Sequence, residues 1–204
     1  MRTPLVLTVL LTLTAAALPA AAQTPPPSQA PLVVRSPART ALLAVGDPSP
    51  DFTAATHDGR TISNGGARAR ALVVYFYPRD ETPGCTREAC AFRDAWARLE
   101  AAGAAVLGVS GDDVASHARF AREHRLQFPL LSDGDGRIAQ AYGVGRFLGM
   151  ASRVSFLVGP DGVVARVFPH VDPAVHADEV VRAIEALAPA APAAPTATSA
   201  PVTA

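Results

Sequence analysis

The fold is decided by the stretch Ala71-Leu-Val-Val-Tyr-Phe-Tyr-Pro-Arg-Asp-Glu-Thr-Pro-Gly-Cys-Thr-Arg-Glu-Ala-Cys90. Its first seven residues, 71–77, form a continuous apolar run rich in β-branched and aromatic side chains, which predicts a strand buried on both faces of a sheet. Helical composition follows from Thr86 to Ala102, and Gly103 is expected to end that helix. The stretch therefore predicts a central strand that passes almost directly into a helix.

Strands and helices alternate through the rest of this region. The expected order after the first helix is a buried strand at 105–110, a helix at 114–124, a short strand at 128–131, a short helix at 137–142, a hairpin of strands 154–158 and 163–168, and a final helix at 175–187. A small hairpin over 52–62, turning at Asp58-Gly59, precedes them. We therefore expect an α/β fold with a central mixed sheet and helices on both faces.

The first 22 residues predict a secretory signal peptide. Arg2 precedes an apolar run from Leu5 to Leu18, and small residues lead to a cleavage site after Ala22. The apolar run is shorter than the roughly 20 residues that span a bilayer, so stable membrane insertion is not expected. We expect an exported protein, either periplasmic or secreted.

Composition sets the remaining boundaries of the chain. Residues 23–41 are rich in Pro, Ser and Ala and predict a flexible linker, and residues 189–204 predict a disordered Ala/Pro-rich tail. The folded domain is therefore expected at 42–188. The 204 residues include 18 basic and 18 acidic side chains, and this balance argues against nucleic acid as a partner. Two cysteines exclude a disulfide-dense scaffold, and the five histidines have no metal-ligand spacing, so neither a metal nor a cofactor is expected.

Cys85 lies between the end of the central strand and the start of its helix, which is where open α/β folds bind ligands. Unpaired backbone N–H groups and the helix dipole favour a thiolate there, and Gly84 permits close approach of the backbone. An ordinary thiol is only about 3% ionised at pH 7, and lowering its pKa to about 6 requires about 3.4 kcal/mol. A helix terminus supplies at most about 2 kcal/mol, so a second cation is needed.

Arg153, just before the strand at 154–158, is the candidate for that cation. Arg79 and Arg87 are closer to Cys85 in sequence, but we expect them to face solvent.

Cys90 follows Cys85 by five residues. An ideal helix would separate their Cα atoms by about 8.6 Å, beyond the roughly 7 Å limit for a disulfide. A Cys85–Cys90 bond would therefore require the helix to unwind, which favours a transient catalytic bond over a structural one. The structural alternative stays open, because exported proteins often oxidise their cysteine pairs.

The motif Pro78-x-x-x-Thr82-x-x-Cys85 resembles the peroxiredoxin active-site pattern. The longer string from Tyr75 to Asp94 resembles the bacterioferritin-comigratory, or Q-type, subgroup. The resemblance extends from about Val45 to Leu187. Supporting matches are Val45-Gly-Asp-Pro-Ser-Pro-Asp-Phe52, Gly108-Val-Ser-Gly-Asp112, Leu130-Leu-Ser-Asp133, Ala141-Tyr-Gly-Val144 and Arg153-Val-Ser-Phe-Leu157.

The resemblance implies a thioredoxin-like fold and reduction of hydrogen peroxide or organic hydroperoxides without a cofactor. Cys85 would be the peroxidatic thiolate and would become a sulfenic acid. Thr82 would orient the peroxide, Arg153 would stabilise charge, and Pro78 would shield the sulfur from water. Cys90 would be the resolving thiol, forming an intramolecular disulfide that an external dithiol protein of thioredoxin type reduces. A resolving thiol in the same chain needs no dimer, so a monomer is expected.

Two other functions remain open from the residues alone. An exported thiol–disulfide oxidoreductase normally uses Cys-x-x-Cys, whereas four residues separate the cysteines here. A non-enzymatic domain with a fixed disulfide is the second. Among the other residues, Phe92 and Trp96 are expected in the core and His117 at the surface.

Overall fold

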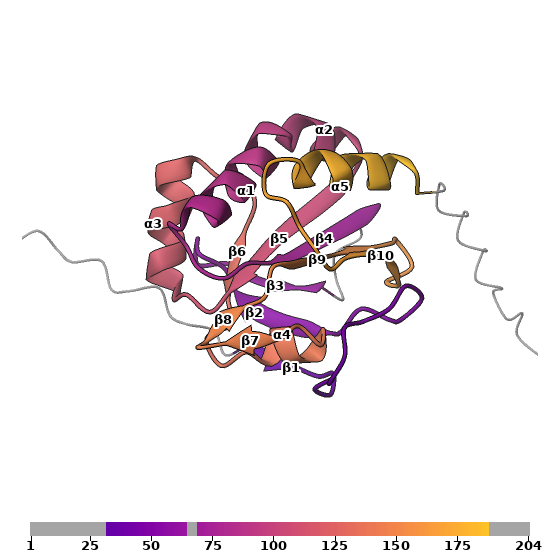
Figure 1. Cartoon of the computed structure of the whole chain (residues 1–204), viewed down its shortest axis with the longest axis horizontal. Helices are drawn as coiled ribbons and strands as arrows, with labels where there is room; N and C mark the ends of the chain where they lie inside the picture. Colours follow the sequence, from indigo (N-terminus) through magenta and orange to yellow (C-terminus); the bar gives the residue numbers. More distant parts are fainter. Residues whose placement is uncertain (1–31, 65–68, 188–204) are drawn as a thin grey trace, which may run out of the picture.

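The computed structural model describes residues 32–64 and 69–187 (Figure 1). The predicted signal peptide at 1–22, the linker before residue 32 and the tail at 189–204 lie outside the described residues. Within the described part of the chain, no helix combines the length and apolar character required to cross a membrane.

A five-stranded mixed sheet forms the centre of the domain, with the strand order β10-β9-β4-β5-β6. These strands are β4 (Ala71–Phe76), β5 (Ala104–Ser110), β6 (Leu130–Ser132), β9 (Val154–Val158) and β10 (Val164–Phe168). β4, β5 and β6 run parallel, whereas β9 is antiparallel to both β4 and β10. All six residues of β4 are buried, which explains its unbroken apolar sequence. The predicted mixed sheet is confirmed.

Helices cover both faces of this sheet, but unequally (Figure 1). One face carries α1 (Pro83–Asp94), α2 (Trp96–Ala101), α3 (Val114–His124) and α5 (His176–Glu185). The other face carries α4 (Arg137–Ala141) and smaller strands: β1 (Val33–Val34), β2 (Phe52–Ala55), β3 (Thr61–Ser63), β7 (Arg146–Phe147) and β8 (Met150–Ala151).

Side chains of β4 alternate between two apolar cores. Val73 and Tyr75 pack in the core beneath α1, together with the buried Phe92 and the half-buried Trp96, as predicted. Val74 and Phe76 pack in the opposite core with α4. The alternation follows from the two-residue period of a strand.

The region from Thr86 to Ala102 contains two helices, α1 and α2, so the prediction of one continuous helix is wrong. Ala95, with φ −85° and ψ 0°, separates them. α1 also begins earlier than expected, because Pro83 occupies its first position, where no backbone N–H is needed. The earlier start places Cys85 inside the first turn.

The linker prediction fails for residues 32–41. Val33 and Val34 form β1 and pair antiparallel with Thr53 and Phe52 of β2. Further along, the backbone N–H of Arg39 donates to the carbonyl of Gln140 at 2.8 Å. Two adjacent β-branched residues therefore add an edge strand to a stretch that composition alone assigned to a linker.

Candidate active site

Cys85 is the third residue of α1, directly after the loop that leaves β4. Its side chain is only 1% exposed and lies in the core on the α1 face of the sheet. The thiol therefore combines burial with the amino-terminal end of a helix, where backbone N–H groups lack helical partners.

Arg153 reaches Cys85 from the neighbouring strand. Val154, the first residue of β9, pairs with Phe76, the last residue of β4, so Arg153 lies beside the end of β4 where α1 begins. Its Nη2 donates to Cys85 Sγ at 3.2 Å. A Cβ on Gly84 would lie 3.2 Å from the same Nη2, so glycine keeps space for the guanidinium.

Glu88 holds the opposite side of the guanidinium and was not predicted as a site residue. It lies one turn after Cys85 on the same face of α1, is fully buried, and accepts a hydrogen bond from Arg153 Nη1. Its Oε1 has no hydrogen-bond partner among the described residues. Burial raises the pKa of Glu88 to about 7, outweighing the attraction of Arg153. The i, i+3 spacing from Cys85 predicts a shared helix face for this residue, but not its burial.

His176 completes the buried polar group from α5. Its Nε2 lies 2.8 Å from Ser155 Oγ and 4.0 Å from Glu88 Oε1. Burial and the charge of Arg153 lower the pKa of His176 to about 4, so the ring is neutral near pH 7. His176 therefore does not neutralise Glu88, and Arg153 is the cation shared by Glu88 and Cys85.

A Glu88→Gln variant should change how the stability depends on pH. The folded protein binds the Glu88 proton more tightly than the unfolded chain, with a pKa near 7 instead of 4.5. Wild-type stability therefore falls as pH rises from about 4.5 to 7, by about 3 kcal/mol from this group. Glutamine does not titrate, so the stability of the variant relative to wild type should rise across this window and stay constant above it. Urea unfolding at pH 5, 6, 7 and 8 measures this; parallel pH profiles would contradict it.

Pro78 and Thr82 lie in the loop between β4 and α1. Thr82 is the N-cap of α1, but its hydroxyl donates to the carbonyl of Arg79 at 3.1 Å instead of capping the helix. Pro78 is half-buried directly after the buried Tyr77. Arg79 is exposed, as expected, and so is Arg87.

Asp80 anchors this loop to α3 through His117. His117 is fully buried, so its predicted surface position is wrong. Its Nδ1 lies 3.0 Å from Asp80 Oδ2 and its Nε2 lies 3.1 Å from the carbonyl of Leu131. Ser116 and Tyr77 also donate to the Asp80 carboxylate, at 2.8 and 2.9 Å. Burial alone would raise the pKa of Asp80, but these hydrogen bonds and the charge of His117 hold it below its ordinary value.

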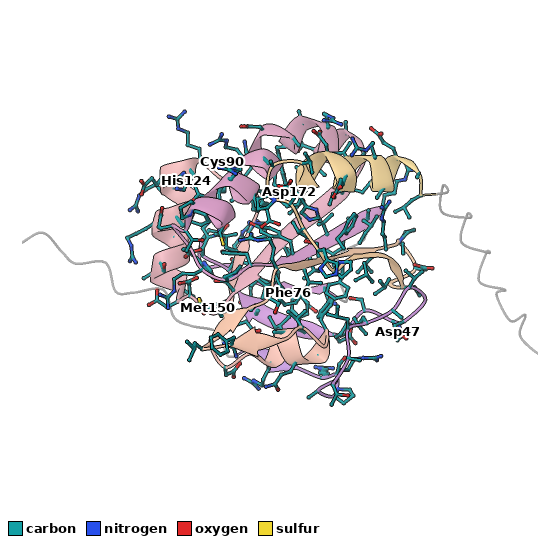
Figure 2. All side chains as sticks on the ribbon, in the orientation of Figure 1. Asp47, Phe76, Cys90, His124, Met150 and Asp172 are labelled. Atoms are coloured by element: carbon teal, nitrogen blue, oxygen red, sulfur yellow. The ribbon has the colours of Figure 1, made fainter. Side chains whose placement is uncertain are left out.

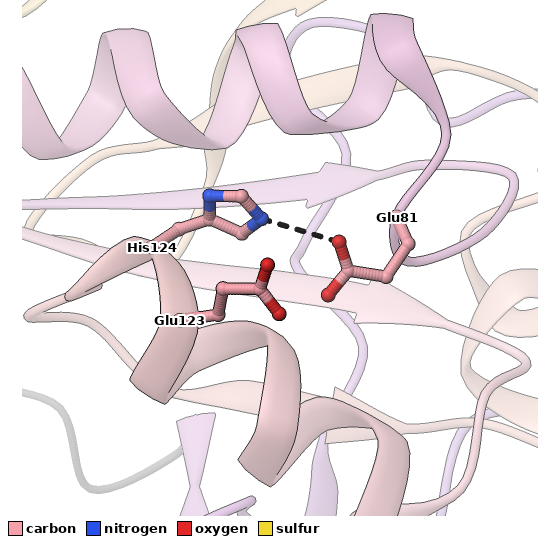
Figure 3. A group of neighbouring side chains, drawn as sticks. All are labelled: Glu81, Glu123 and His124. Atoms are coloured by element: carbon pink, nitrogen blue, oxygen red, sulfur yellow. Dashed lines mark hydrogen bonds and ion pairs between the residues drawn. The ribbon is translucent and has the colours of Figure 1, made fainter.

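Cys90 is half-buried further along α1, and both cysteines are free thiols. His124, the last residue of α3, points its Nδ1 to Cys90 Sγ at 4.0 Å. The other ring nitrogen lies 3.2 Å from Glu81 Oε2 (Figure 3). The polar atoms of Glu81, Glu123 and His124 lie within 4.8 Å of one another, but both carboxylates are exposed and His124 is already bonded to Glu81. We assign this group as a hydrogen-bonded pair beside the second cysteine, not as a metal site.

The comparisons with known proteins agree with this geometry. The family model described as the AhpC/TSA family matches residues 45–167, more than half of the chain. The chain belongs to the AhpC/TSA family of peroxiredoxins. Peroxiredoxin Q of the chloroplast of Populus jackii is 41% identical to it over 143 residues, covering 69% of this chain and 67% of that protein.

Solved structures of peroxiredoxins have the same fold. Peroxidoxin BcpB from Mycobacterium tuberculosis aligns with a TM-score of 0.66 and 33% identity over 71% of this chain and 97% of its own. Peroxiredoxin Q from Xanthomonas campestris aligns with a TM-score of 0.62 and 36% identity over 66% of this chain and 89% of its own. This peroxiredoxin is therefore a thiol peroxidase of the bacterioferritin-comigratory, or Q, type with a thioredoxin-like fold.

Proposed function

We propose that this peroxiredoxin reduces hydrogen peroxide and organic hydroperoxides at Cys85. The Cys85 thiolate attacks one peroxide oxygen, the O–O bond breaks, and the leaving oxygen takes a proton to become water or an alcohol. Cys85 is left as a sulfenic acid. Alkyl peroxide reduction is the activity described for the bacterioferritin comigratory protein of Xanthomonas campestris, which is 35% identical to this chain, and this likeness supports the proposal.

The contact of Arg153 Nη2 with Cys85 Sγ at 3.2 Å is the observation that carries this proposal. Glu88 holds the guanidinium from the protein interior and leaves Nη2 directed at the sulfur. The fixed positive charge stabilises the thiolate and then the negative charge that develops on the peroxide oxygens. Thr82 and Pro78, in the loop above the thiol, are proposed to orient the peroxide and to exclude water.

Cys90 is proposed to resolve the sulfenic acid. Its thiolate attacks the sulfur of oxidised Cys85, the S–O bond breaks and hydroxide leaves, which forms a Cys85–Cys90 disulfide. Because both cysteines lie on one helix, α1 must unwind around Cys85 before they meet. An external dithiol protein of thioredoxin type would reduce the disulfide. We also propose that the protein is exported and cleaved after Ala22, so its reductant would be an exported protein as well.

Peroxide titration followed by mass spectrometry tests both assignments. One equivalent of hydrogen peroxide should convert the wild-type protein to a species lighter by two hydrogens, with the loss localised to Cys85 and Cys90. The Cys90→Ser protein should consume one peroxide, form a sulfenic acid at Cys85 and stop without reductant. The Cys85→Ser protein keeps only the Cys90 thiol and should not consume peroxide at a comparable rate.

Two results would contradict the proposal. Cys90→Ser protein that reacts with peroxide no faster than free cysteine would remove Cys85 as the peroxidatic thiol. Reduction of insulin by the wild-type protein without peroxide consumption would favour the thiol–disulfide oxidoreductase instead.

A further inference from the structure

Cys90 faces a histidine across the interface of two helices. Figure 2 shows Cys90 on α1 and His124 at the end of α3, close together on the same side of the molecule. His124 Nδ1 lies 4.0 Å from Cys90 Sγ, within the range of a hydrogen bond that involves sulfur. A thiol must lose its proton before it can attack a sulfenic acid, and a neutral imidazole nitrogen at this position is a suitable acceptor.

Glu81 selects the tautomer of His124 that can accept a proton from the Cys90 thiol. The carboxylate of Glu81 lies 3.2 Å from His124 Nε2 (Figure 3) and can only accept a hydrogen bond when ionised. Nε2 therefore carries the ring hydrogen of neutral His124, and the lone pair of Nδ1 faces the sulfur of Cys90. The arrangement of thiol, imidazole and carboxylate follows the logic of a nucleophile, its base and an orienting group.

Neighbouring groups hold the ring in place. The His124 ring packs edge-on against Phe120, with 4.9 Å between ring centroids, and the side chain is 19% exposed. Arg93 Nη1 donates to the His124 carbonyl at 3.1 Å and fixes the end of α3. The charged groups that face the pair are Arg93 from α1, Glu81 from the loop before α1 and Glu123 from α3.

We propose that His124 is the general base of the resolving step and that Glu81 is its positioning residue. The inference rests on the proposed resolving role of Cys90. His124 Nδ1 takes the proton of the Cys90 thiol, and the thiolate attacks Cys85 sulfenic acid once α1 unwinds. The S–O bond breaks, the two sulfurs join, and the departing hydroxide recovers one proton through solvent to become water. Nothing is oxidised or reduced beyond the two sulfur atoms of the disulfide.

Quench-flow mass spectrometry separates the two steps. In a His124→Gln protein, sulfenic acid should form at Cys85 at the wild-type rate, because the side-chain hydrogen bonds of His124 go to Cys90 and Glu81 and not to Cys85. Disulfide formation at pH 7 should be slower by about 10²-fold, the usual contribution of a positioned base. The deficit should vanish near pH 10, where hydroxide ionises a thiol without help. Glu81→Gln should slow the same step by less, and its deficit should also vanish near pH 10.

Glu123→Gln is the matched control for Glu81→Gln. Both substitutions remove one negative charge from the cluster of Glu81, Glu123 and His124. Because His124 Nε2 lies 3.2 Å from Glu81, disulfide formation in Glu123→Gln should keep the wild-type rate. A His124→Gln protein that forms the disulfide at the wild-type rate at pH 7 would overturn the proposal, and so would a deficit that persists at pH 10. If wild-type protein forms no Cys85–Cys90 disulfide at all, the resolving role of Cys90 itself is wrong.

Discussion

An Arg153→Met protein should reduce peroxide about 10²–10³-fold more slowly than the wild type, the usual cost of removing one charge-stabilising donor. Methionine has a similar length but no charge, so both the thiolate and the developing charge on the peroxide lose their cation. The variant should also be less stable, because Glu88 is fully buried and would lose its partner. Without Arg153 the pKa of Glu88 rises further, so the buried carboxyl is protonated at pH 7 and lacks its hydrogen-bond partner, which costs about 1–3 kcal/mol.

The double variant Arg153→Met, Glu88→Gln separates these two effects. Glutamine is neutral without taking up a proton, so the double variant avoids the cost of protonating a buried carboxyl at pH 7, and its stability should return most of the way to wild type. The peroxidase rate should remain low, because Cys85 still lacks its cation. Stopped-flow peroxide kinetics measure the peroxidase rate, and urea unfolding at pH 7 measures the stability. If the double variant regained activity together with stability, Arg153 would act only through folding, and its place in the mechanism would be lost.

Local sequence was sufficient to predict the position of the thiol. A run of β-branched and aromatic residues can bury both faces only as a central strand, and the strand leads directly into the helix that carries Cys85. Arg153 could also be predicted, because the size of the stabilisation that a thiolate needs exceeds what a helix terminus supplies. The need for a second cation followed from this comparison of energies, and Arg153 was the candidate because it directly precedes the buried strand at 154–158.

Charged residues that lie in the core could not be predicted in the same way. Glu88 and Asp80 look like ordinary surface acids in a sequence, because most acidic side chains face water. Each is buried only because a partner distant in sequence reaches it: Arg153 for Glu88 and His117 for Asp80. The pairing of His124 with Glu81 could not be predicted for the same reason, since their contact depends on how α3 packs against the loop before α1.

Asp80→Asn should destabilise the protein by about 1.5–3 kcal/mol, because it weakens buried hydrogen bonds to a charged acceptor. The buried Asp80 carboxylate lies 3.0 Å from His117 Nδ1 and accepts hydrogen bonds from the hydroxyls of Ser116 and Tyr77. Asparagine keeps the shape but removes the negative charge that strengthens these hydrogen bonds and replaces one acceptor oxygen with an NH₂ donor. Asp178→Asn is the matched control: it removes an exposed pair with Arg98 and should cost less than about 1 kcal/mol.

The pH dependence gives this prediction a second check. Hydrogen bonds hold the pKa of Asp80 below its ordinary value of 3.8, so its contribution is complete above that value and is lost as pH falls further. The stabilities of wild type and Asp80→Asn, measured by urea unfolding, should therefore differ by a constant amount near neutral pH and converge as pH falls below 3.8. A loss of less than about 1 kcal/mol at pH 7 would contradict the buried pair. Because the Asp80 loop also carries Pro78 and Thr82, the peroxidase rate of the variant should fall even where the protein remains folded.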